Sequence, residues 1–366
     1  MRILFTVQGE GRGHLTQALA LHERLLRWGH ELVGVVAGKD PQGGRELPAY
    51  FTQAFPSPVA TLPSPTFATR GHRSINMAAT VTRALRGLGT WRESVARLRA
   101  LVHETRADLI VNFFEPLTGL AQLRKPLPAP VLAVGHQFLL RDPSYGRLHG
   151  HAIERWGMRR FVSLVGHKSW RLALSLNTVA DRPGERWFAA PPLLRESLFS
   201  LEPTPGDYIL VYVLNHGYLE EVAAWHARHN AIPVHCFSDR PGAPDVEEVA
   251  PNLTYHRLNA DAFLRMMAGC RAVATTAGFE SVSEAAWLGK PLLVVPVGGH
   301  VEQRMNAADT EQTGLGRSAD SFDLDRLLEA APPPERYAAF REWVRRGDAV
   351  MERVMREAAG VPRSPA

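Results

Sequence analysis

The sequence is poor in cysteine, because only Cys236 and Cys270 occur among its 366 residues. Two cysteines cannot form the disulfide framework of a small secreted domain, so a reducing, cytoplasmic setting is expected. Neither cysteine has the spacing of a zinc site, and no H-E-x-x-H motif occurs. A G-x-S-x-G elbow is also absent, which leaves hydrolase chemistry of that type without support. We therefore expect no resident metal or cofactor.

Long hydrophobic runs are missing as well. No stretch approaches the ~20 apolar residues of a membrane-spanning helix, and the apolar run at residues 3–7 is too short for a signal peptide. The net charge of +5 is small for this length and forms no basic tail, so no nucleic-acid partner is expected. With 45% hydrophobic and 22% charged residues, the composition is that of a globular protein with a large core, soluble or at most peripheral to a membrane.

Short apolar runs that end in glycine or polar residues predict buried strands. The first two, at residues 3–7 and 31–38, enclose a glycine loop and a helix, which together form a βαβ unit with parallel strands. Similar runs follow at residues 107–114, 129–137, 207–215, 232–238, 252–258, 271–276 and 291–297. Strands that alternate with helices predict the α/β class with doubly wound sheets.

Five prolines between residues 181 and 206 predict a break between two domains. We expect an N-terminal domain at 1–180, a linker at 181–206, a second α/β domain at 207–333 and a C-terminal helical segment at 334–366. Residues 40–70 are rich in proline, serine and glycine and predict irregular loops over a binding face.

An arginine-rich helix is predicted over residues 79–106. One interpretation is that it docks on an anionic membrane. The other is that its apolar positions simply pack against the core.

The loop after the first strand carries Gly9, Gly11 and Gly13, followed by His14 in the first turn of the helix. Glycines let a ligand approach the backbone closely, and a helix N-terminus favours an anion. The dinucleotide fingerprint G-x-G-x-x-G is broken, because its sixth position is His14. The helix dipole favours a neutral imidazole there, which suits a general base, although a capping or packing histidine would fit the same position.

The stretch from Thr275 to Ala307 is the most informative part of the chain. A strand ends near Thr275, and Gly278 and Ser281 then open a helix whose N-terminus suits a diphosphate. Glu284 follows one to two turns into that helix, where a carboxylate can accept the two hydroxyls of a ribose. Glu302, Gln303 and Asn306 follow the next strand, and the combination of an acid with an amide suits the hydroxyls of a sugar ring.

In this order these residues resemble the donor-binding signature of the GT-B glycosyltransferases. Plant-type UDP-glycosyltransferases carry H-C-G-W-N-S-x-x-E followed by P-x-x-x-[DE]-Q-x-x-N-A, and the MurG-like N-acetylglucosaminyltransferases carry a related version. The loop G-x-G-H at 11–14 is similar to the family's N-terminal loop. The resemblance implies two facing Rossmann-like domains with parallel sheets and an interdomain cleft, with a final helix that crosses back to the first domain.

The resemblance also implies roles for individual residues. Gly278, Ser281 and Thr276 would contact the diphosphate and Glu284 the ribose, while Glu302 and Gln303 would contact the transferred sugar. The backbone near Arg257 and Leu258 would hold the base of a UDP-sugar, and Gly13 would line the donor site from the first domain. His14 would be the general base of an inverting, metal-independent transfer of a hexose or N-acetylhexosamine to an acceptor hydroxyl on a lipid, a cell-envelope component or a small molecule.

The sequence departs from that pattern at several positions. Thr276 replaces a histidine, and Glu280 replaces an asparagine near the diphosphate. The aspartate that orients the base would fall near Asn112, which has no charge, so the nearest acid, Glu115, is the candidate to stand in for it. His136 is a further candidate at a strand end, with a structural histidine as the simpler interpretation.

Other functions fit part of the pattern. A nucleotide-sugar hydrolase or a UDP-N-acetylglucosamine 2-epimerase would share the fold, and a non-catalytic nucleotide-sugar binding protein is consistent with the missing acid at Asn112. A dinucleotide oxidoreductase is disfavoured by His14 in the fingerprint.

Overall fold

The computed structural model describes residues 1–41, 46–65, 69–70, 74–75, 87–142, 145, 152–213, 216–240, 242–329 and 331–361. The chain divides into two compact units. Unit 1 comprises residues 1–69, 75–195 and 344–366, and unit 2 comprises residues 70–74 and 196–343. A pair of two-residue strands, β4 (Thr69–Arg70) and β5 (Ser74–Ile75), lies at the junction of these ranges in the sequence.

Unit 1 is built on a seven-stranded parallel sheet in the order β3-β2-β1-β6-β7-β8-β9. Its strands are β1 (Arg2–Gln8), β2 (Glu31–Lys39), β3 (Ala60–Pro63), β6 (Leu109–Phe113), β7 (Val131–Val134), β8 (Trp170–Leu174) and β9 (Trp187–Ala190). Its helices are α1 (Arg12–Arg27), α2 (Ala49–Thr52), α4 (Leu88–Thr105), α5 (Pro116–Gln122), α6 (Ala152–Val165) and α14 (Gly347–Ala359), with 3₁₀ turns at His136–Arg141 and Pro183–Glu185. This is the doubly wound order, in which the chain reverses direction across the sheet between β1 and β6.

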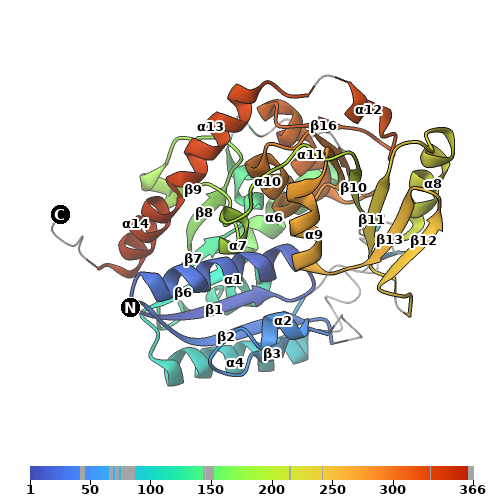
Figure 1. Ribbon diagram of the computed structural model, residues 1–366. Coiled ribbons are helices and arrows are strands. Elements are labelled where there is room, and N and C mark those ends of the chain that lie inside the picture. The colour runs from blue at the N-terminus through green and yellow to red at the C-terminus, as the bar shows by residue number, and fades with distance from the viewer. Residues whose placement is uncertain are drawn as a thin grey trace. The chain divides into compact units, whose positions relative to one another are not determined.

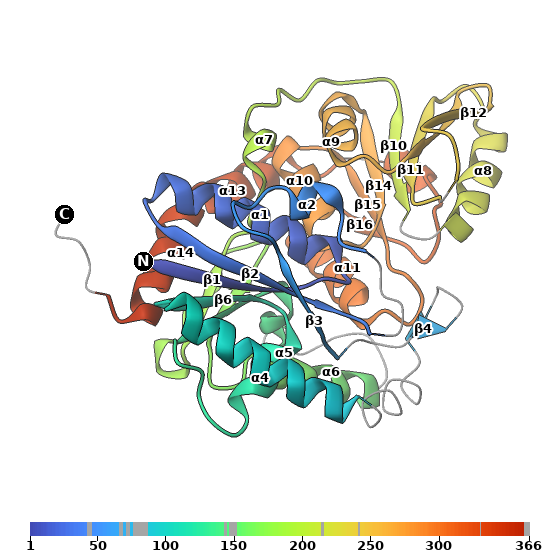
Figure 2. The same cartoon turned by 90° about the horizontal axis from the view of Figure 1, so that it is seen from below.

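The two faces of this sheet are covered by different helices. Helix α4 lies on the face opposite α1 (Figures 1 and 2). There Leu98 and Val102 of α4 join a buried cluster with Leu4 and Ile110, and Val95 packs against it. Helix α14 contacts β6, β7 and β9. The apolar face of α4 is therefore part of the core, which supports the packing interpretation for the described part of the arginine-rich segment; residues 79–86 of that prediction lie outside the described residues.

Unit 2 repeats the same topology. Its sheet has the order β12-β13-β11-β10-β14-β15-β16 and is parallel except at the edge strand β12. The strands are β10 (Ile209–Val213), β11 (Val234–Ser238), β12 (Val246–Ala250), β13 (Leu253–Arg257), β14 (Ala272–Thr276), β15 (Leu292–Val295) and β16 (Arg317–Ser318). The helices are α7 (Glu196–Phe199), α8 (Leu219–Arg228), α9 (Ala260–Gly269), α10 (Phe279–Leu288), α11 (Val301–Thr313), α12 (Asp325–Leu328) and α13 (Pro334–Arg345), with a 3₁₀ turn at His216–Tyr218.

The predicted α/β class with parallel sheets is confirmed, but the proline-rich stretch is not irregular throughout. Strand β9 lies inside it and forms the edge of the first sheet, with Trp187 and Phe188 fully buried. The prolines at 183 and 191 flank this strand and leave its hydrogen-bond ladder intact. Residues 40–70 likewise contain a strand, β3, that pairs with β2.

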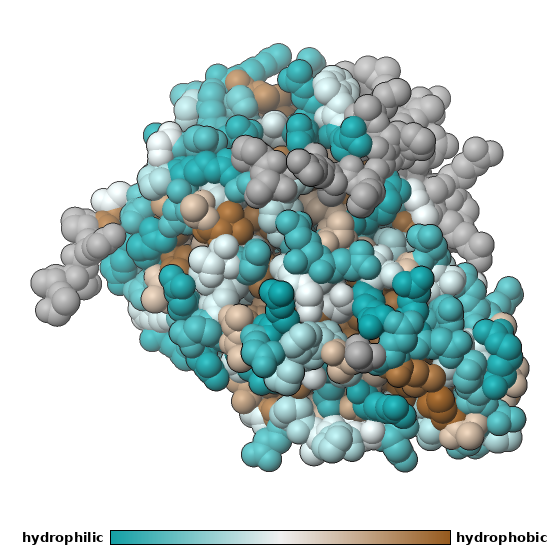
Figure 3. All heavy atoms as spheres, turned by 90° about the horizontal axis from the view of Figure 1, so that it is seen from above, coloured by the Kyte–Doolittle hydropathy of each residue, from teal (hydrophilic) through white to brown (hydrophobic). Residues whose placement is uncertain are grey.

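Among the described residues, the exposed large hydrophobic side chains are Leu26, Tyr50, Leu123, Trp156, Phe199, Val246, Val249 and Leu328. On the face shown in Figure 3, the described residues are mostly hydrophilic, and hydrophobic residues lie in small groups between them. Within the described ranges, no helix has both the length and the hydrophobicity needed to cross a bilayer.

Candidate active site

His14 lies at the carboxyl end of β1, next to the point where the strand order of unit 1 reverses. Gly11 is the N-cap of α1 and offers no side-chain cap, so the helix opens with backbone N–H groups and no acidic residue in its first turn. The loop before it is fixed to the end of β2, where Gly9 N donates to Gly38 O over 2.9 Å and Asp40 N donates to Glu10 Oε1 over 2.9 Å. The loop therefore presents His14 from a fixed position.

The imidazole of His14 is buried and held from two sides. Its Nδ1 lies 3.3 Å from Gln17 Oε1, and its ring stacks on Phe114 with a centroid distance of 5.5 Å. Because an amide oxygen only accepts hydrogen bonds, the Gln17 contact places the proton on Nδ1 and the lone pair on Nε2. Nε2 is thus the atom of His14 that can act as a base.

Phe114 was not singled out from the sequence, because an aromatic residue at the end of an apolar run reads as part of the strand. Its φ is +57°, a left-handed conformation that is uncommon for a bulky side chain. This conformation turns the chain out of β6 and directs the ring toward His14, while Phe138 and Phe161 contact the ring edge-on. Strained residues of this kind cluster at functional sites.

The side chain of Asn112 makes a set of hydrogen bonds that an aspartate could not reproduce. Its Oδ1 accepts hydrogen bonds from Glu115 N at 2.7 Å and from Thr6 Oγ1 at 3.2 Å, and its Nδ2 donates to Glu115 O at 3.1 Å. An aspartate has no N–H for the last bond and would repel that carbonyl. The amide at this position therefore shapes the turn that leads into Glu115.

Glu115 follows β6, the strand beside β1, and is the N-cap of α5. Its Oε1 accepts from Leu117 N at 2.9 Å and from the hydroxyl of Ser64, whereas Oε2 has no hydrogen-bond partner among the described residues. Complete burial raises the pKa of Glu115 to about 7, because the charged form loses its hydration and the hydrogen bonds from Ser64 and Leu117 only partly offset that loss.

Gly38 makes room for this carboxyl. A Cβ built on Gly38 would lie 1.9 Å from Glu115 Oε2, so no larger residue fits without displacing the carboxyl group. Sequence reasoning found Glu115 but neither Gly38 nor Ser64, because these residues come from the ends of β2 and β3 and meet Glu115 only in the folded sheet.

His136 is buried and its Nδ1 lies 2.8 Å from Leu174 O. A bond to a backbone carbonyl is what a structural histidine makes.

In unit 2 the residues of the C-terminal motif gather at the carboxyl ends of β14 and β15. Helix α10 begins after Gly278 with no side-chain cap, and Ser281, Ser283 and Glu284 on it are buried. Thr276 ends β14 and is buried, whereas Glu280 lies half-buried in the first turn of α10. The strand order reverses between β10 and β14, so this helix N-terminus lies at the switch point of the second sheet, where ligands bind in doubly wound folds.

The hydroxyl of Ser281 is already engaged, since it donates to Gly278 O at 3.1 Å and lies 3.3 Å from Thr275 Oγ1. An anion at this terminus would therefore meet backbone N–H groups before it met the Ser281 hydroxyl.

Two residues of the second half of the motif, Gln303 and Asn306, connect neighbouring loops through hydrogen bonds. Gln303 Oε1 accepts from Val297 N at 2.8 Å, and Asn306 Nδ2 donates to Ala277 O at 2.8 Å. Asn306 Oδ1 is buried without a hydrogen-bond partner among the described residues. Glu302 lies half-buried in the first turn of α11, beside Gln303.

Arg257 and Leu258 lie at the end of β13, two strands away from β10. Arg257 is exposed and forms an ion pair with Asp245, and Leu258 is half-exposed. The structure thus places Arg257 and Leu258 at the same edge of the sheet as Gly278 and Glu284.

Comparisons with known proteins show the family of this chain. Residues 1–330 match the family described as glycosyl transferase family 1. An uncharacterised glycosyltransferase of Methanosarcina mazei is 26% identical over 355 residues, which cover 92% of this chain and 87% of the relative.

Two solved structures show the fold. UGT2 of Phytolacca americana, complexed with UDP-2-fluoro-glucose and pterostilbene, gives a TM-score of 0.63 at 14% identity and covers 98% of this chain and 99% of its own. The spinosyn rhamnosyltransferase SpnG, complexed with thymidine diphosphate, gives a TM-score of 0.54 at 15% identity and covers 99% of this chain and 97% of its own. The fold is therefore GT-B, and the chain, a glycosyltransferase, belongs to glycosyl transferase family 1.

Proposed function

We propose that the protein is an inverting, metal-independent glycosyltransferase that moves a hexose or N-acetylhexosamine from a UDP-sugar to an acceptor hydroxyl. The observation that carries this proposal is that each unit has, at the switch point of its own sheet, a helix N-terminus without a side-chain cap. One offers a buried imidazole with a lone pair on Nε2, and the other offers a buried carboxylate, Glu284, and an acceptor, Asn306 Oδ1, that has no hydrogen-bond partner in the described part of the chain.

The chemistry follows from these groups. His14 Nε2 takes the proton of the acceptor hydroxyl while the acceptor oxygen forms a bond to the anomeric carbon. The bond from that carbon to the diphosphate oxygen breaks, and its electrons leave with the diphosphate. Backbone N–H groups at the start of α10 stabilise the charge that develops on the leaving group.

The remaining roles are those that the resemblance to the GT-B donor signature implies. Gly278, Ser281 and Thr276 line the diphosphate site and Glu284 accepts the ribose hydroxyls. Glu302 and Gln303 bind the sugar, and the chain at Arg257 and Leu258 holds the base. Gly13 in the loop of unit 1 allows close approach of the donor. The solved relatives support a nucleoside diphosphate, since one carries a UDP-sugar analogue and another thymidine diphosphate.

We place the protein in the cytoplasm, because both cysteines are free and buried, as in a reducing compartment.

A ligand panel tests the proposal. Melting temperatures are measured with UDP, TDP, GDP and NADH, because a ligand that binds only the native state raises the melting temperature. UDP is expected to give the largest shift, and UDP-sugars with added acceptors are expected to release UDP equally well with and without EDTA. Free sugar formed without acceptor would identify a hydrolase, UDP binding without any turnover would identify a binding protein, and a shift with NADH alone would overturn the proposal.

The role of Glu284 gives a separate prediction. Glu284→Gln is expected to weaken UDP binding by about 10- to 100-fold, because a hydrogen bond to a charged group contributes about 1.5–3 kcal/mol. The wild-type protein should prefer UDP to 2′-deoxy-UDP, and the variant should lose that preference. Isothermal titration calorimetry with both nucleotides measures the effect.

Glu280→Gln is the matched control, because Glu280 lies on the same helix but in its half-buried first turn. It should bind UDP at least as tightly as wild type, since it removes a negative charge near the diphosphate. If Glu284→Gln kept both the affinity and the preference for the 2′-hydroxyl, Glu284 would not be the ribose ligand.

A further inference from the structure

The chain passes between the two units at four places, two of them on either side of residues 70–74. The two further along the chain are the first and second passages. The first passage follows Arg195, just before α7. The second lies between Trp343 and Val344, in the last turn of α13, which ends at Arg345 just before α14 begins at Gly347. Two compact units joined by such connections are expected to move relative to each other.

The two helices at the second passage, α13 and α14, are anchored in different units. In α13, Tyr337 donates to Lys290 O at 3.1 Å and Arg341 donates to Trp287 O at 2.7 Å, both within unit 2. In α14, Arg353 forms an ion pair of 2.9 Å with Asp181 within unit 1. Residues 345–347 therefore form a joint between two fixed helices.

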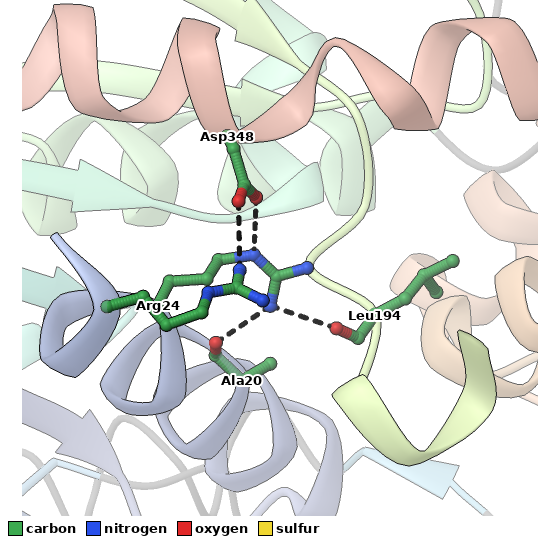
Figure 4. A network of polar contacts seen from close by, with 5 residues as sticks. Ala20, Arg24, Leu194 and Asp348 are labelled. Atoms are coloured by element: carbon green, nitrogen blue, oxygen red, sulfur yellow. Dashed lines mark hydrogen bonds and ion pairs between the residues drawn. The ribbon is translucent and has the colours of Figure 1, made fainter. Parts of the chain in front are cut away.

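A single side chain of unit 1 holds the unit 1 ends of both passages (Figure 4). Arg24 on α1 donates from Nη1 to Leu194 O at 3.0 Å and to Ala20 O at 2.8 Å, and from Nε to Asp348 Oδ1 at 2.9 Å. Leu194 lies two residues before the first passage, and Asp348 is the second residue of α14. Arg27 reaches the other oxygen of Asp348 at 2.9 Å.

The guanidinium of Arg24 is buried, so it needs all of these partners. Arg24 is 5% exposed, and a buried guanidinium is tolerated only when charged and hydrogen-bonding partners compensate its lost hydration. The Leu194 carbonyl and the Asp348 carboxylate are two of these partners. If either moved away, the buried guanidinium of Arg24 would lose a hydrogen bond that compensates its charge. The planar fork of arginine suits this task, since its N–H groups point in fixed directions.

Helix α1 connects this anchor to the active site. His14 stands in the first turn of α1, and Arg24 lies ten residues further along the same helix, about 15 Å away along its axis. We propose that Arg24 is a positioning residue, which fixes the first and second passages between the units to the helix that carries the base. This proposal rests on the proposed function for the role of His14, whereas the anchoring of the two connections does not.

The anchoring is tested without any ligand. Leu123 of unit 1 and Val249 of unit 2 are exposed, so Leu123→Cys and Val249→Cys carry spin labels, and pulsed electron resonance gives the distribution of distances between them. Cys236 and Cys270 are buried, and burial raises the pKa of both thiols, so they should not react with the label.

Arg24→Met should broaden the distribution clearly, because both connections lose their anchor. Arg27→Met is the matched control, since Arg27 contacts the same carboxylate from the surface, and it should leave the distribution close to that of wild type. If the two variants gave the same distribution, Arg24 would not hold the connections. Asp348→Asn keeps the size of the side chain and serves as the second variant should Arg24→Met fail to fold.

The positioning of His14 is tested by kinetics with a UDP-sugar. Arg24→Met should lower kcat by about 10- to 100-fold, as expected when a catalytic group is misplaced, and should leave the Kd for UDP within about twofold, because the residues proposed to bind the nucleotide belong to unit 2. Arg24→Lys should recover part of kcat. A kcat equal to that of Arg27→Met would overturn the positioning role. A wild-type protein that binds UDP but turns over no UDP-sugar would refute the proposed function alone, since the distance distribution still decides on the anchor.

Discussion

His14→Ala is expected to lower kcat for sugar transfer by about 10²- to 10⁴-fold, the usual contribution of a general base. The loss should be in kcat, because the variant removes the proton acceptor and leaves the proposed nucleotide-binding residues of unit 2 untouched. The Kd for UDP should stay within about twofold of wild type. Initial rates of UDP release and calorimetry of UDP binding measure the two quantities.

His22→Ala is the control for this experiment. His22 is also a buried histidine of α1, but it lies two turns further along and contacts Phe55. It should retain most of the activity once its melting temperature has been allowed for. Wild-type turnover in His14→Ala would show that another group accepts the proton.

The largest expected effect on stability concerns Glu115. Its pKa in the folded protein, about 7, lies above the ordinary value of 4.5, so the folded state resists ionisation. Below pH 4.5 the carboxyl is protonated in both the folded and the unfolded state. Between pH 4.5 and pH 7 only the unfolded state ionises, and the free energy of unfolding falls by roughly 3 kcal/mol across this window.

Glu115→Gln should remove this pH dependence, because glutamine resembles the protonated carboxyl in shape and can accept the bonds from Ser64 and Leu117. Urea unfolding at pH 5 and pH 8 measures the effect. Relative to wild type, the variant should become more stable as the pH rises. Glu31→Gln, which changes an exposed carboxylate of the same unit, should show no such trend. Equal pH dependence in wild type and Glu115→Gln would mean that Glu115 is ionised in the folded protein throughout.

A carboxyl with a pKa of about 7 is only partly charged at neutral pH. Glu115 therefore differs from the strongly ionised acid that would best stabilise an imidazolium. Ser64 and Leu117 use one of its oxygens, which leaves Oε2 as the atom for a further partner. Its role in orienting the base stays a prediction, and its role in capping α5 is visible.

The sequence was sufficient for the class of fold and for the strands that contribute to the site. Continuous apolar runs predicted β1, β2, β6, β7 and most strands of unit 2, because strands buried on both faces carry little else. Seven of the described strands were missed, namely β3, β4, β5, β8, β9, β12 and β16. β9 lies among prolines, β3 lies in a loop-like composition, and β12 is a mostly exposed edge strand. Composition describes a segment, whereas pairing with a neighbour decides whether it becomes a strand.

In the candidate site, too, some features follow from local sequence and others depend on the folded structure. His14, Gly278 and Glu284 could be predicted because each belongs to a local strand–loop–helix pattern. Phe114 could not, because nothing in the sequence signals its left-handed backbone. Ser64, Gly38 and Glu115 are brought together by three parallel strands, and the bond between Asn306 and Ala277 spans 29 residues. Such contacts depend on tertiary structure, and a single sequence carries no direct record of them.

The discontinuity of unit 1 has a consequence for synthesis on the ribosome. Domains usually fold as they emerge, the N-terminal one first. Here α14, whose Met351, Val354 and Met355 are buried, contacts β6, β7 and β9 but is translated only after all of unit 2. The nascent first unit must therefore wait, with that face of its sheet uncovered, until the second unit has been made. A chaperone that shields this face during translation would suit this order of elements along the chain. A circular permutant that moves α14 ahead of β1 would remove the delay.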